Sequence, residues 1–176
     1  NMFRLLASIG VIALALAIAS GFFFYGGFFD VAANGEEENP LIARQIAQVR
    51  MASIRRHATD RAPVDFGDPA RTRAGAALFA RQGCANCHGA PGAKWMKFAE
   101  GMNPSPPELK EAAEDMSSSE IFWVVKHGIR MTGMPSFASA GVQDDDIWSI
   151  VAFVKKIADV PEADYRSWTA QPAPAQ

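Results

Sequence analysis

GCANCHG, residues 83–89, places two cysteines three positions apart and a histidine directly after the second one. These are the only cysteines among the 176 residues, which is too few for a disulfide framework. A structural zinc ion would need further ligands at suitable spacing, and no other cysteine is present. A thioredoxin-like dithiol belongs in a βαβ unit, and the surrounding sequence has no convincing strand pattern. The motif therefore indicates a different chemistry.

Cys84-Ala-Asn-Cys87-His88 matches the attachment pattern of c-type haem. Two cysteines at this spacing on a turn of helix can reach the two vinyl groups along one edge of a porphyrin. The residue that follows then points its imidazole towards the iron. The single motif predicts one covalently bound haem c, anchored by Cys84 and Cys87, with His88 as the first axial ligand.

The second axial ligand has several candidates downstream. A methionine sulfur would close the iron and raise its reduction potential. The stretch GIRMTGMPSF, residues 128–137, contains Met131 and Met134. Met134 is the stronger candidate because Pro135 follows it and restricts the backbone of an extended loop. His127 is an alternative ligand, although a histidine at a helix C-terminus also suits the helix dipole.

On these motifs, roughly residues 71–157 resemble the class I cytochromes c of the bacterial, single-haem, membrane-anchored kind. The resemblance implies an all-α haem domain of about three to five helices, with Met134 as the axial sulfur. It also implies that the carbonyl of Pro107 accepts the other ring N–H of His88 and fixes its tautomer. The residues that resemble the family's packing pairs on the first and last helices are Gly75, Phe79, Trp148 and Phe153.

Capping signals delimit the predicted haem domain, residues 68–165. Asp68-Pro69 suits the start of a helix, and Ser117-x-x-Glu120 has the pattern of a capping box. The last strong helix is expected to begin at the acidic triplet 144–146. Residues 89–116 carry prolines and glycines and are expected to be mostly loop. Residues 166–176 are expected to form a disordered tail.

Residues 1–30 are predicted to be a transmembrane anchor. Residues 5–29 contain no charged residue, and as a helix they would span about 37 Å, against about 30 Å for a bilayer core. Arg4 before the run and acidic residues after it favour a cytoplasmic N-terminus and a periplasmic haem domain at a bacterial inner membrane. A cleaved signal peptide is the alternative, but the apolar run continues well past its candidate cleavage site at residues 17–19.

Residues 31–67 are expected to connect the anchor to the haem domain, with a helix over residues 39–57. Apolar residues recur there at helical spacing and arginines lie between them. The helix is either a partly solvated spacer or a segment docked on lipid headgroups or a partner subunit. Trp123 lies either in the haem pocket or in the core, and His57 is expected to be solvated. The apolar residues that recur at helical spacing over residues 39–57 are Ile42, Ile46, Val49 and Ile54, and the arginines are Arg44, Arg50, Arg55 and Arg56.

Together these features predict an electron-transfer protein of a respiratory chain and not an enzyme. It would act as a fixed subunit of a membrane complex or as a tethered carrier, with a quinol-oxidising complex, a terminal oxidase or a dehydrogenase as partner. A haem enzyme or gas sensor with an open or labile sixth position is the alternative, and a structural subunit with a vestigial haem is a third. A net charge of −2 gives no reason to expect nucleic-acid binding. A basic docking rim is a further candidate, formed by Arg81, Lys94, Lys97, Lys126 and Arg130 with acidic residues among them.

Overall fold

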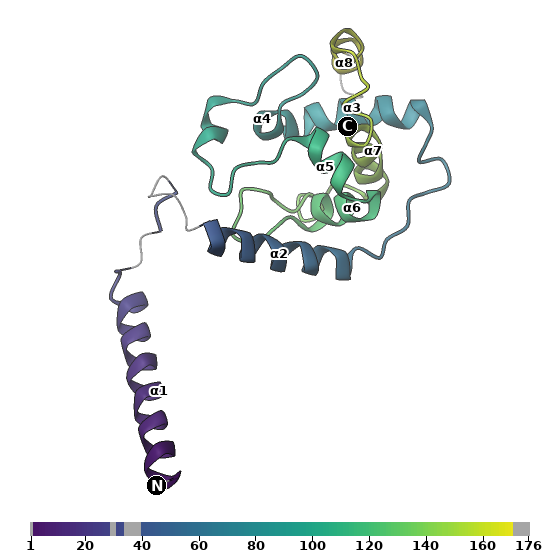
Figure 1. Cartoon of the computed structure of the whole chain (residues 1–176). Coiled ribbons are helices and arrows are strands. Elements are labelled where there is room, and N and C mark those ends of the chain that lie inside the picture. The colour runs from purple at the N-terminus through teal and green to yellow at the C-terminus, as the bar shows by residue number, and fades with distance from the viewer. Residues whose placement is uncertain (1, 29–30, 34–39, 171–176) are drawn as a thin grey trace. The chain divides into compact units, whose positions relative to one another are not determined.

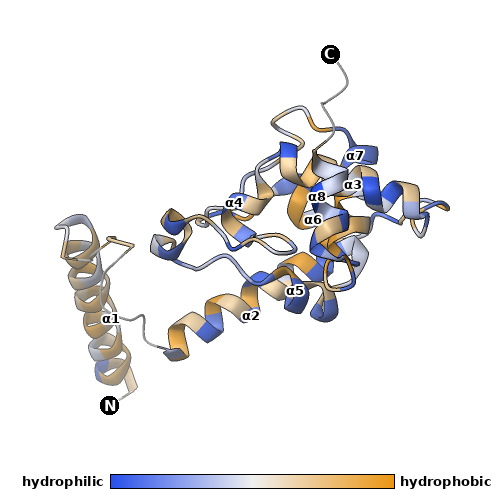
Figure 2. Cartoon of the chain, turned by 90° about the horizontal axis from the view of Figure 1, so that it is seen from above, coloured by the Kyte–Doolittle hydropathy of each residue, from blue (hydrophilic) through white to orange (hydrophobic). Residues whose placement is uncertain are grey.

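The computed structural model describes residues 2–28, 31–33 and 40–170, and the chain divides into two compact units, residues 1–37 and 38–176 (Figure 1). In the first unit, helix α1, Met2–Tyr25, buries none of its side chains. Figure 2 shows hydrophobic residues along most of its length. The helix is long and apolar enough to cross a membrane, a test that signal sequences near an N-terminus also pass.

Over its described residues, the regular secondary structure of the second unit consists of helices and no strands, apart from one isolated bridge between Ala90 and Ala93. The predicted all-α class is thus confirmed, although residues 68–170 contain more helices than the expected three to five. The elements are α2 Pro40–His57, α3 Pro69–Arg81, α4 Cys84–His88, the 3-10 helix η1 Lys97–Gly101, α5 Leu109–Asp115, α6 Ser118–His127, α7 Asp144–Val154 and α8 Glu162–Thr169.

The predicted helix starts at Asp68 and Ser117 are both present. The Asp68 carboxylate accepts a hydrogen bond of 2.8 Å from the backbone N–H of Ala70, one of the free donors at the start of α3. The Ser117 hydroxyl accepts from the N–H of Glu120, and the Glu120 carboxylate accepts from the N–H of Ser117 at 2.6 Å. This capping box fixes the first residue of α6.

The core is centred on the crossing of α3 and α7. Gly75 of α3 lies against the backbone of Ser149 in α7, where a Cβ would overlap the Ser149 carbonyl. The missing side chain therefore allows the two helices to approach closely. Phe79 and Phe153 meet beside this contact with ring centroids 5.2 Å apart, and Trp148 stacks on Phe122 of α6 at 4.1 Å. These rings are all buried and form the centre of the hydrophobic core.

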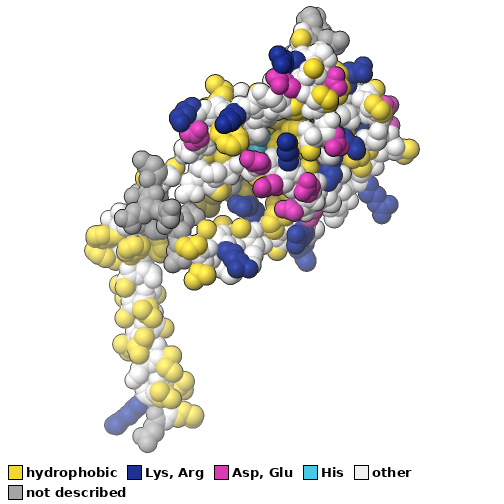
Figure 3. All heavy atoms as spheres, turned by 45° about the horizontal axis from the view of Figure 1, so that its top comes forward, with side chains coloured by type: hydrophobic (Ala, Val, Ile, Leu, Met, Phe, Trp, Pro, Cys, Tyr) yellow, Lys and Arg dark blue, Asp and Glu magenta, His cyan; other side chains and the backbone are white. Residues whose placement is uncertain are grey.

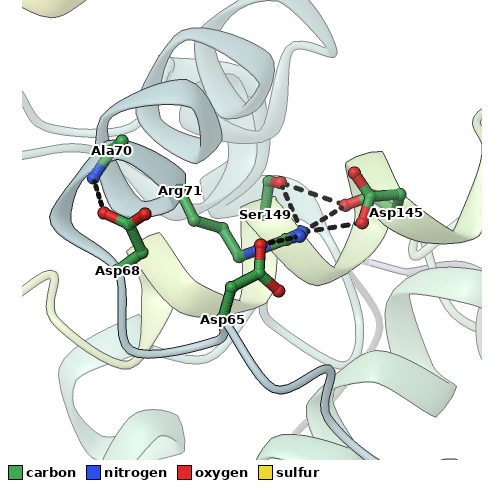
Figure 4. A network of polar contacts seen from close by, with 6 residues as sticks. All are labelled: Asp65, Asp68, Ala70, Arg71, Asp145 and Ser149. Atoms are coloured by element: carbon green, nitrogen blue, oxygen red, sulfur yellow. Dashed lines mark hydrogen bonds and ion pairs between the residues drawn. The ribbon is translucent and has the colours of Figure 1, made fainter.

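A polar network crosses the same junction at its edge (Figure 4). The guanidinium of Arg71 donates to the Asp65 carboxylate at 2.7 Å and to the Asp145 carboxylate at 2.9 Å. It also donates to the Ser149 hydroxyl, which itself donates to the carbonyl of Asp145. Hydrogen bonds from Arg71 lower the pKa of Asp65, and the same bonds raise the pKa of Arg71. The network ties the loop before α3 to the first turn of α7.

Two segments are more ordered than the sequence suggested. The prediction of a disordered tail from residue 166 is wrong as far as Thr169, because α8 packs on α3. Tyr165 stacks on Phe153 with centroids 5.6 Å apart, and Arg73 lies over the ring of Trp168 at 5.8 Å. The rest of the predicted tail, residues 171–176, lies outside the described residues.

Helix α5 lies within the stretch 89–116 that was expected to be mostly loop. The last carbonyls of a helix have no hydrogen-bond donor within the helix. Here a cationic side chain from another element donates to them. The ammonium of Lys155, at the end of α7, donates to the carbonyls of Ala113 and Met116. A seven-residue helix is stable here because its C-terminus is capped by tertiary contact.

Helix α2 packs on α6 and belongs to the same compact unit as the predicted haem domain. Ile54 is 2% exposed, and the carbonyl of Asp60 accepts a 2.6 Å hydrogen bond from the Ser119 hydroxyl. Arg55 pairs with Glu120 at 3.4 Å. The predicted start of the helix at residue 39 lies outside the described residues. The connector helix is therefore docked on its own domain, with the apolar residues on its other face exposed: Leu41, Ile42, Ile46 and Val49.

Candidate haem-binding site

Helix α4 is a single turn held between two glycines in the left-handed region. Gly83 has a φ of 75° and Gly89 a φ of 71°, angles that other residues adopt with strain. A Cβ on Gly89 would also lie 3.0 Å from the carbonyl oxygen of Ala93. The two glycines allow the chain to turn sharply into and out of α4. As a result Cys84, Cys87 and His88 all line one cavity.

The orientation of His88 is fixed by one hydrogen bond. Its Nδ1 lies 3.0 Å from the carbonyl oxygen of Pro107, which is the contact that the family resemblance implied. Because a carbonyl only accepts, the proton is on Nδ1, and Nε2 keeps its lone pair. Burial lowers the pKa of His88, against the opposing effect of the Pro107 carbonyl. A neutral imidazole with a free Nε2 is the form that binds a metal.

The two cysteines are free and half-buried. Burial, with a smaller contribution from Cys87, raises the pKa of the Cys84 thiol to about 12. A redox-active dithiol or a zinc site requires a thiolate, which this environment disfavours. Within residues 2–28, 31–33 and 40–170 no group of three or more His, Cys, Asp and Glu side chains is placed to hold a metal ion. The surroundings therefore fit covalent attachment of a haem better than either alternative.

Met134 is presented by a loop with a defined backbone. The N–H of Ile129 donates to the carbonyl of Met134 at 3.1 Å, and the N–H of Met134 donates to the Thr132 hydroxyl at 3.1 Å. Gly128 has a φ of 67°, and a Cβ there would lie 2.6 Å from the carbonyl carbon of Pro135. The start and the end of the loop thus press against each other. Met134 lines the cavity and packs on the core.

The cavity that these residues line has a volume of about 680 Å³, within the range of about 300–1,000 Å³ that is usual for cofactor and ligand sites. Figure 3 shows one face of the molecule, on which a small area of histidine lies between hydrophobic side chains with charges of both signs around it. Such apolar walls and two cysteines beside a histidine suit a haem. The apolar residues of its wall include Phe79, Leu109, Ile121, Val125, Ile129, Phe137, Ile150 and Val154.

Residues 70–154 match the family model described as cytochrome C oxidase, cbb3-type, subunit III. This part of the chain is a class I c-type cytochrome domain. The match extends over α3 to α7 and leaves out α2 and α8. Neither the curated proteins nor the solved structures contain a match to the chain. The cytochrome domain supports haem-based electron transfer, and its family implies haem c as the cofactor.

The other candidate axial ligands in the cytochrome domain, Met131 and His127, lie away from the cavity. Met131 is 97% exposed, has a φ of 59° and does not line the cavity. His127 is exposed and packs on Trp123 with ring centroids 5.1 Å apart. Trp123 itself stacks on His57 of α2 at 6.1 Å, so it lies at the junction of α2 and α6 and not in the haem cavity. Of the two methionines in the loop, Met134 is the one placed to reach a haem.

The candidate docking rim of the cytochrome domain is partly neutralised. Lys97 pairs with Glu100 at 2.7 Å, and Lys126 pairs with Asp144 at 2.7 Å. Neither lysine therefore offers a full positive charge to a redox partner. Arg81, Lys94 and Arg130 have no ionic partner among the described residues.

Sequence reasoning missed two contributions to the cavity of the cytochrome domain. Met102, in the loop after η1, lines the cavity and lies against Gly133, where a Cβ would overlap the Met102 methyl group. Helix α2 supplies four further lining residues although it lies upstream of the family match. The helical spacing of Ile54 with other apolar residues was the available signal, but it does not reveal what a helix packs on. The four residues are Arg50, Met51, Ile54 and Arg55.

Proposed function

We propose that this chain is a membrane-anchored, single-haem cytochrome c that transfers electrons one at a time on the periplasmic side of a bacterial inner membrane. The observation that carries the proposal is the convergence of Cys84, Cys87, His88 and Met134 on one apolar cavity of a cytochrome domain. A histidine and a methionine that line the same cavity suit the two axial positions of one iron.

Each of these residues has a separate task in the proposal. Cys84 and Cys87 hold the porphyrin by two thioether bonds, while Nε2 of His88 and the sulfur of Met134 bind the iron. The Pro107 carbonyl holds the His88 ring in the required tautomer. The bound haem supplies a one-electron couple between ferric and ferrous iron. The apolar wall and the soft methionine sulfur favour the ferrous state and raise the reduction potential.

If His88 and Met134 both held the iron, its two axial positions would be filled, which argues for electron transfer rather than catalysis. A haem enzyme or gas sensor needs an open or labile sixth position, whereas the hydrogen bonds around Thr132 and the contact of Gly128 with Pro135 hold Met134 in one place. Electron transfer would then require no substrate to reach the iron. The enzyme alternative therefore makes a distinct prediction about small ligands of the iron.

Helix α1 is the proposed anchor. Its length and composition suit a membrane span, and Arg4 lies at its N-terminal end. A tether would keep the cytochrome domain near membrane partners and so raise its effective concentration there. The haem domain is proposed to be periplasmic, in agreement with the charge bias around the helix.

The partners are proposed to be respiratory complexes. The matching family is described as a subunit of a cytochrome c oxidase, which favours a fixed place in an oxidase complex. The docking of α2 on the cytochrome domain supports this choice. It leaves only residues 26–39 between α1 and α2, and this link is shorter than the whole connector that a mobile carrier could use as a tether. Two alternatives would use the haem in the same way. The chain could be a tethered carrier between a quinol-oxidising complex and a terminal oxidase, or a subunit of a dehydrogenase.

Carbon monoxide binding to the ferrous full-length protein in detergent tests the proposal. The wild-type protein is expected to carry one covalent haem with a reversible couple and to exclude carbon monoxide at neutral pH. Met134→Ala should open the site and bind the gas, whereas Met131→Ala and Met102→Ala should behave as wild type. Ready binding by the wild-type protein would identify an open-site enzyme or sensor instead. Carbon monoxide binding by the Met102→Ala protein alone would identify Met102, and not Met134, as the axial ligand of the iron.

Co-purification tests the proposed partners. The tagged chain is solubilised from native membranes in mild detergent, and the proteins that stay with it in constant ratio are identified. Oxidase, quinol-oxidase or dehydrogenase subunits in such a ratio would establish a fixed subunit and its circuit. A lone cytochrome that one complex reduces and another oxidises would establish a tethered carrier.

A further inference from the structure

Helix α2 lines the haem cavity although it precedes the segment that matches the cytochrome family. We propose that α2 is a wall of the haem site and that its Arg50 binds a propionate of the haem. The inference rests on the proposed function, since it requires a haem in the cavity. It assigns a cofactor contact to a helix outside the family match.

The first step is that α2 has a fixed position on the domain. Ile54 is buried and lines the cavity, and α2 as a whole packs on α6. The ion pair of Arg55 with Glu120 and the hydrogen bond from Ser119 to Asp60 hold the helix and the chain after it. Arg50 lies one turn before Ile54 and therefore on the same side of the helix.

The second step separates the two arginines of α2 that line the cavity. Arg55 is already paired with Glu120, and its side chain is 66% exposed. Arg50 is half-buried, and no hydrogen bond or ion pair joins its side chain to any described residue of the chain. A guanidinium that loses part of its water beside an apolar cavity is costly unless an anion compensates it. Arg50 therefore lacks the partner that its position calls for.

The third step identifies that partner. The two carboxylates of a haem lie on the edge opposite the two vinyl positions that Cys84 and Cys87 would hold. Helix α4 packs on α3, whereas α2 packs on α6, and Figure 1 shows α4 and α2 at opposite sides of the domain. The carboxylate edge would thus face away from α4. The planar fork of an arginine matches a carboxylate with two parallel hydrogen bonds.

The charges around the cavity favour Arg50 over other residues as the contact. The charged and titratable groups that line it are Arg50 and Arg55 of α2, Glu111 and Asp115 of α5, and Cys84, Cys87 and His88 of α4, of which the two cysteines would be bound to the haem. The two acids repel a propionate, and Arg55 is neutralised by Glu120. A propionate paired with Arg50 stays ionised, and its charge is balanced. The positive charge of Arg50 then favours the ferrous haem relative to the ferric haem.

Equilibrium redox titration of the full-length protein in detergent, between about pH 5 and pH 8, tests the inference. Arg50→Gln should shift the ferric-to-ferrous ratio about tenfold towards ferric at pH 8, which lowers the midpoint potential by about 59 mV for one electron. Without Arg50 the propionate takes up a proton within this range, so the midpoint potential should rise again as the pH falls. The wild-type potential should change little over the same interval. Arg50→Lys should recover part of the shift because it keeps the charge.

Arg56→Gln is the matched control, because it removes the same charge from an exposed position of the same helix outside the cavity. Equal potentials and equal pH profiles for Arg50→Gln and Arg56→Gln would overturn the inference and leave the proposed function intact. If the wild-type chain itself had no covalent haem or no reversible couple, both would fall. Arg50→Met keeps the apolar part of the side chain and gives the same comparison if the glutamine variant folds poorly.

Discussion

The contact of α3 with α7 and the contact of α2 with α6 hold the cytochrome domain together in different ways. The first lies inside the family match and buries Gly75, Phe79 and Phe153 at the centre of the core. The second joins a helix from outside the match through Ile54 and a few polar contacts at the surface. Each contact contributes a residue to the wall of the same cavity: Phe79 from α3 and Ile54 from α2.

The difference separates stability from control of the site. A contact between two backbones, such as that of Gly75 with Ser149, tolerates no added volume and determines whether the domain folds. A contact at the edge, such as that of α2, can vary without loss of the fold. It can therefore adjust the charge and the solvent access of the cavity. Substitutions at matched positions in the two contacts test this distinction.

The largest effect is expected from Gly75→Ala. Its Cβ would overlap the carbonyl of Ser149, and backbone atoms cannot rotate away, so α3 and α7 must separate. We expect a loss of about 3 kcal/mol or more in the free energy of unfolding. Denaturant unfolding followed by circular dichroism measures this loss. Gly67→Ala is the control, since a Cβ there meets no atom within 4 Å, and its unfolding should differ little from wild type.

Ile54→Ala tests the second contact and should have the next largest effect. Ile54 is the buried residue of α2, and truncating its side chain leaves a void where the helix meets the domain, at a cost of about 2–4 kcal/mol. Ile46→Ala on the same helix truncates an exposed side chain and should cost little. A similar loss in both variants would show that α2 does not dock through Ile54. The comparison of their denaturation midpoints decides between the two outcomes.

Much of the core contact was predictable from the sequence because its signals are local. Asp68 and Ser117 are caps whose partners lie two or three residues away, so short patterns reveal them. Gly75, Phe79, Trp148 and Phe153 were assigned from the family resemblance, and the structure brings them together in the core. The motif at Cys84–His88 and the pair Met134-Pro135 likewise identify the residues that line the cavity.

The edge contacts were not predictable because they depend on residues far apart in the chain. The apolar spacing of α2 indicated an amphipathic helix, but both of its faces carry apolar residues, and only Ile54 is buried. The C-terminal cap of α5 comes from Lys155, which follows α7. The order of residues 166–169 depends on the packing of α8 on α3. Sequence patterns report which side of a helix is apolar, and they do not report what covers it.

Arg71→Met should have a smaller effect on the core contact. The variant keeps an apolar stem but loses the hydrogen bonds to Asp65, Asp145 and Ser149. The Arg71 side chain is largely buried, and the Ser149 hydroxyl keeps its bond to the Asp145 carbonyl, so we expect a loss of about 1–2 kcal/mol. Arg73→Met, on the same helix, removes a charge outside this network. An equal loss in both variants would count against a role for the network in joining α3 to α7.

The smallest effect is expected at Glu120, where the α2 contact meets the capping box of α6. Burial raises the pKa of Glu120, but hydrogen bonds from Ser117 and the charge of Arg55 outweigh it, so the pKa lies below its usual value. A carboxyl whose pKa is lower in the folded state stabilises the fold above the unfolded pKa of about 4.3 and stops doing so as the pH falls through the folded pKa. Glu120→Gln should therefore cost about 1 kcal/mol near pH 7 and almost nothing at the lowest pH at which the domain remains folded. Glu114→Gln, at an exposed position of α5, is the matched control and should cost little in the same unfolding series. A Glu120 effect that grew towards acid pH would contradict the assigned contacts.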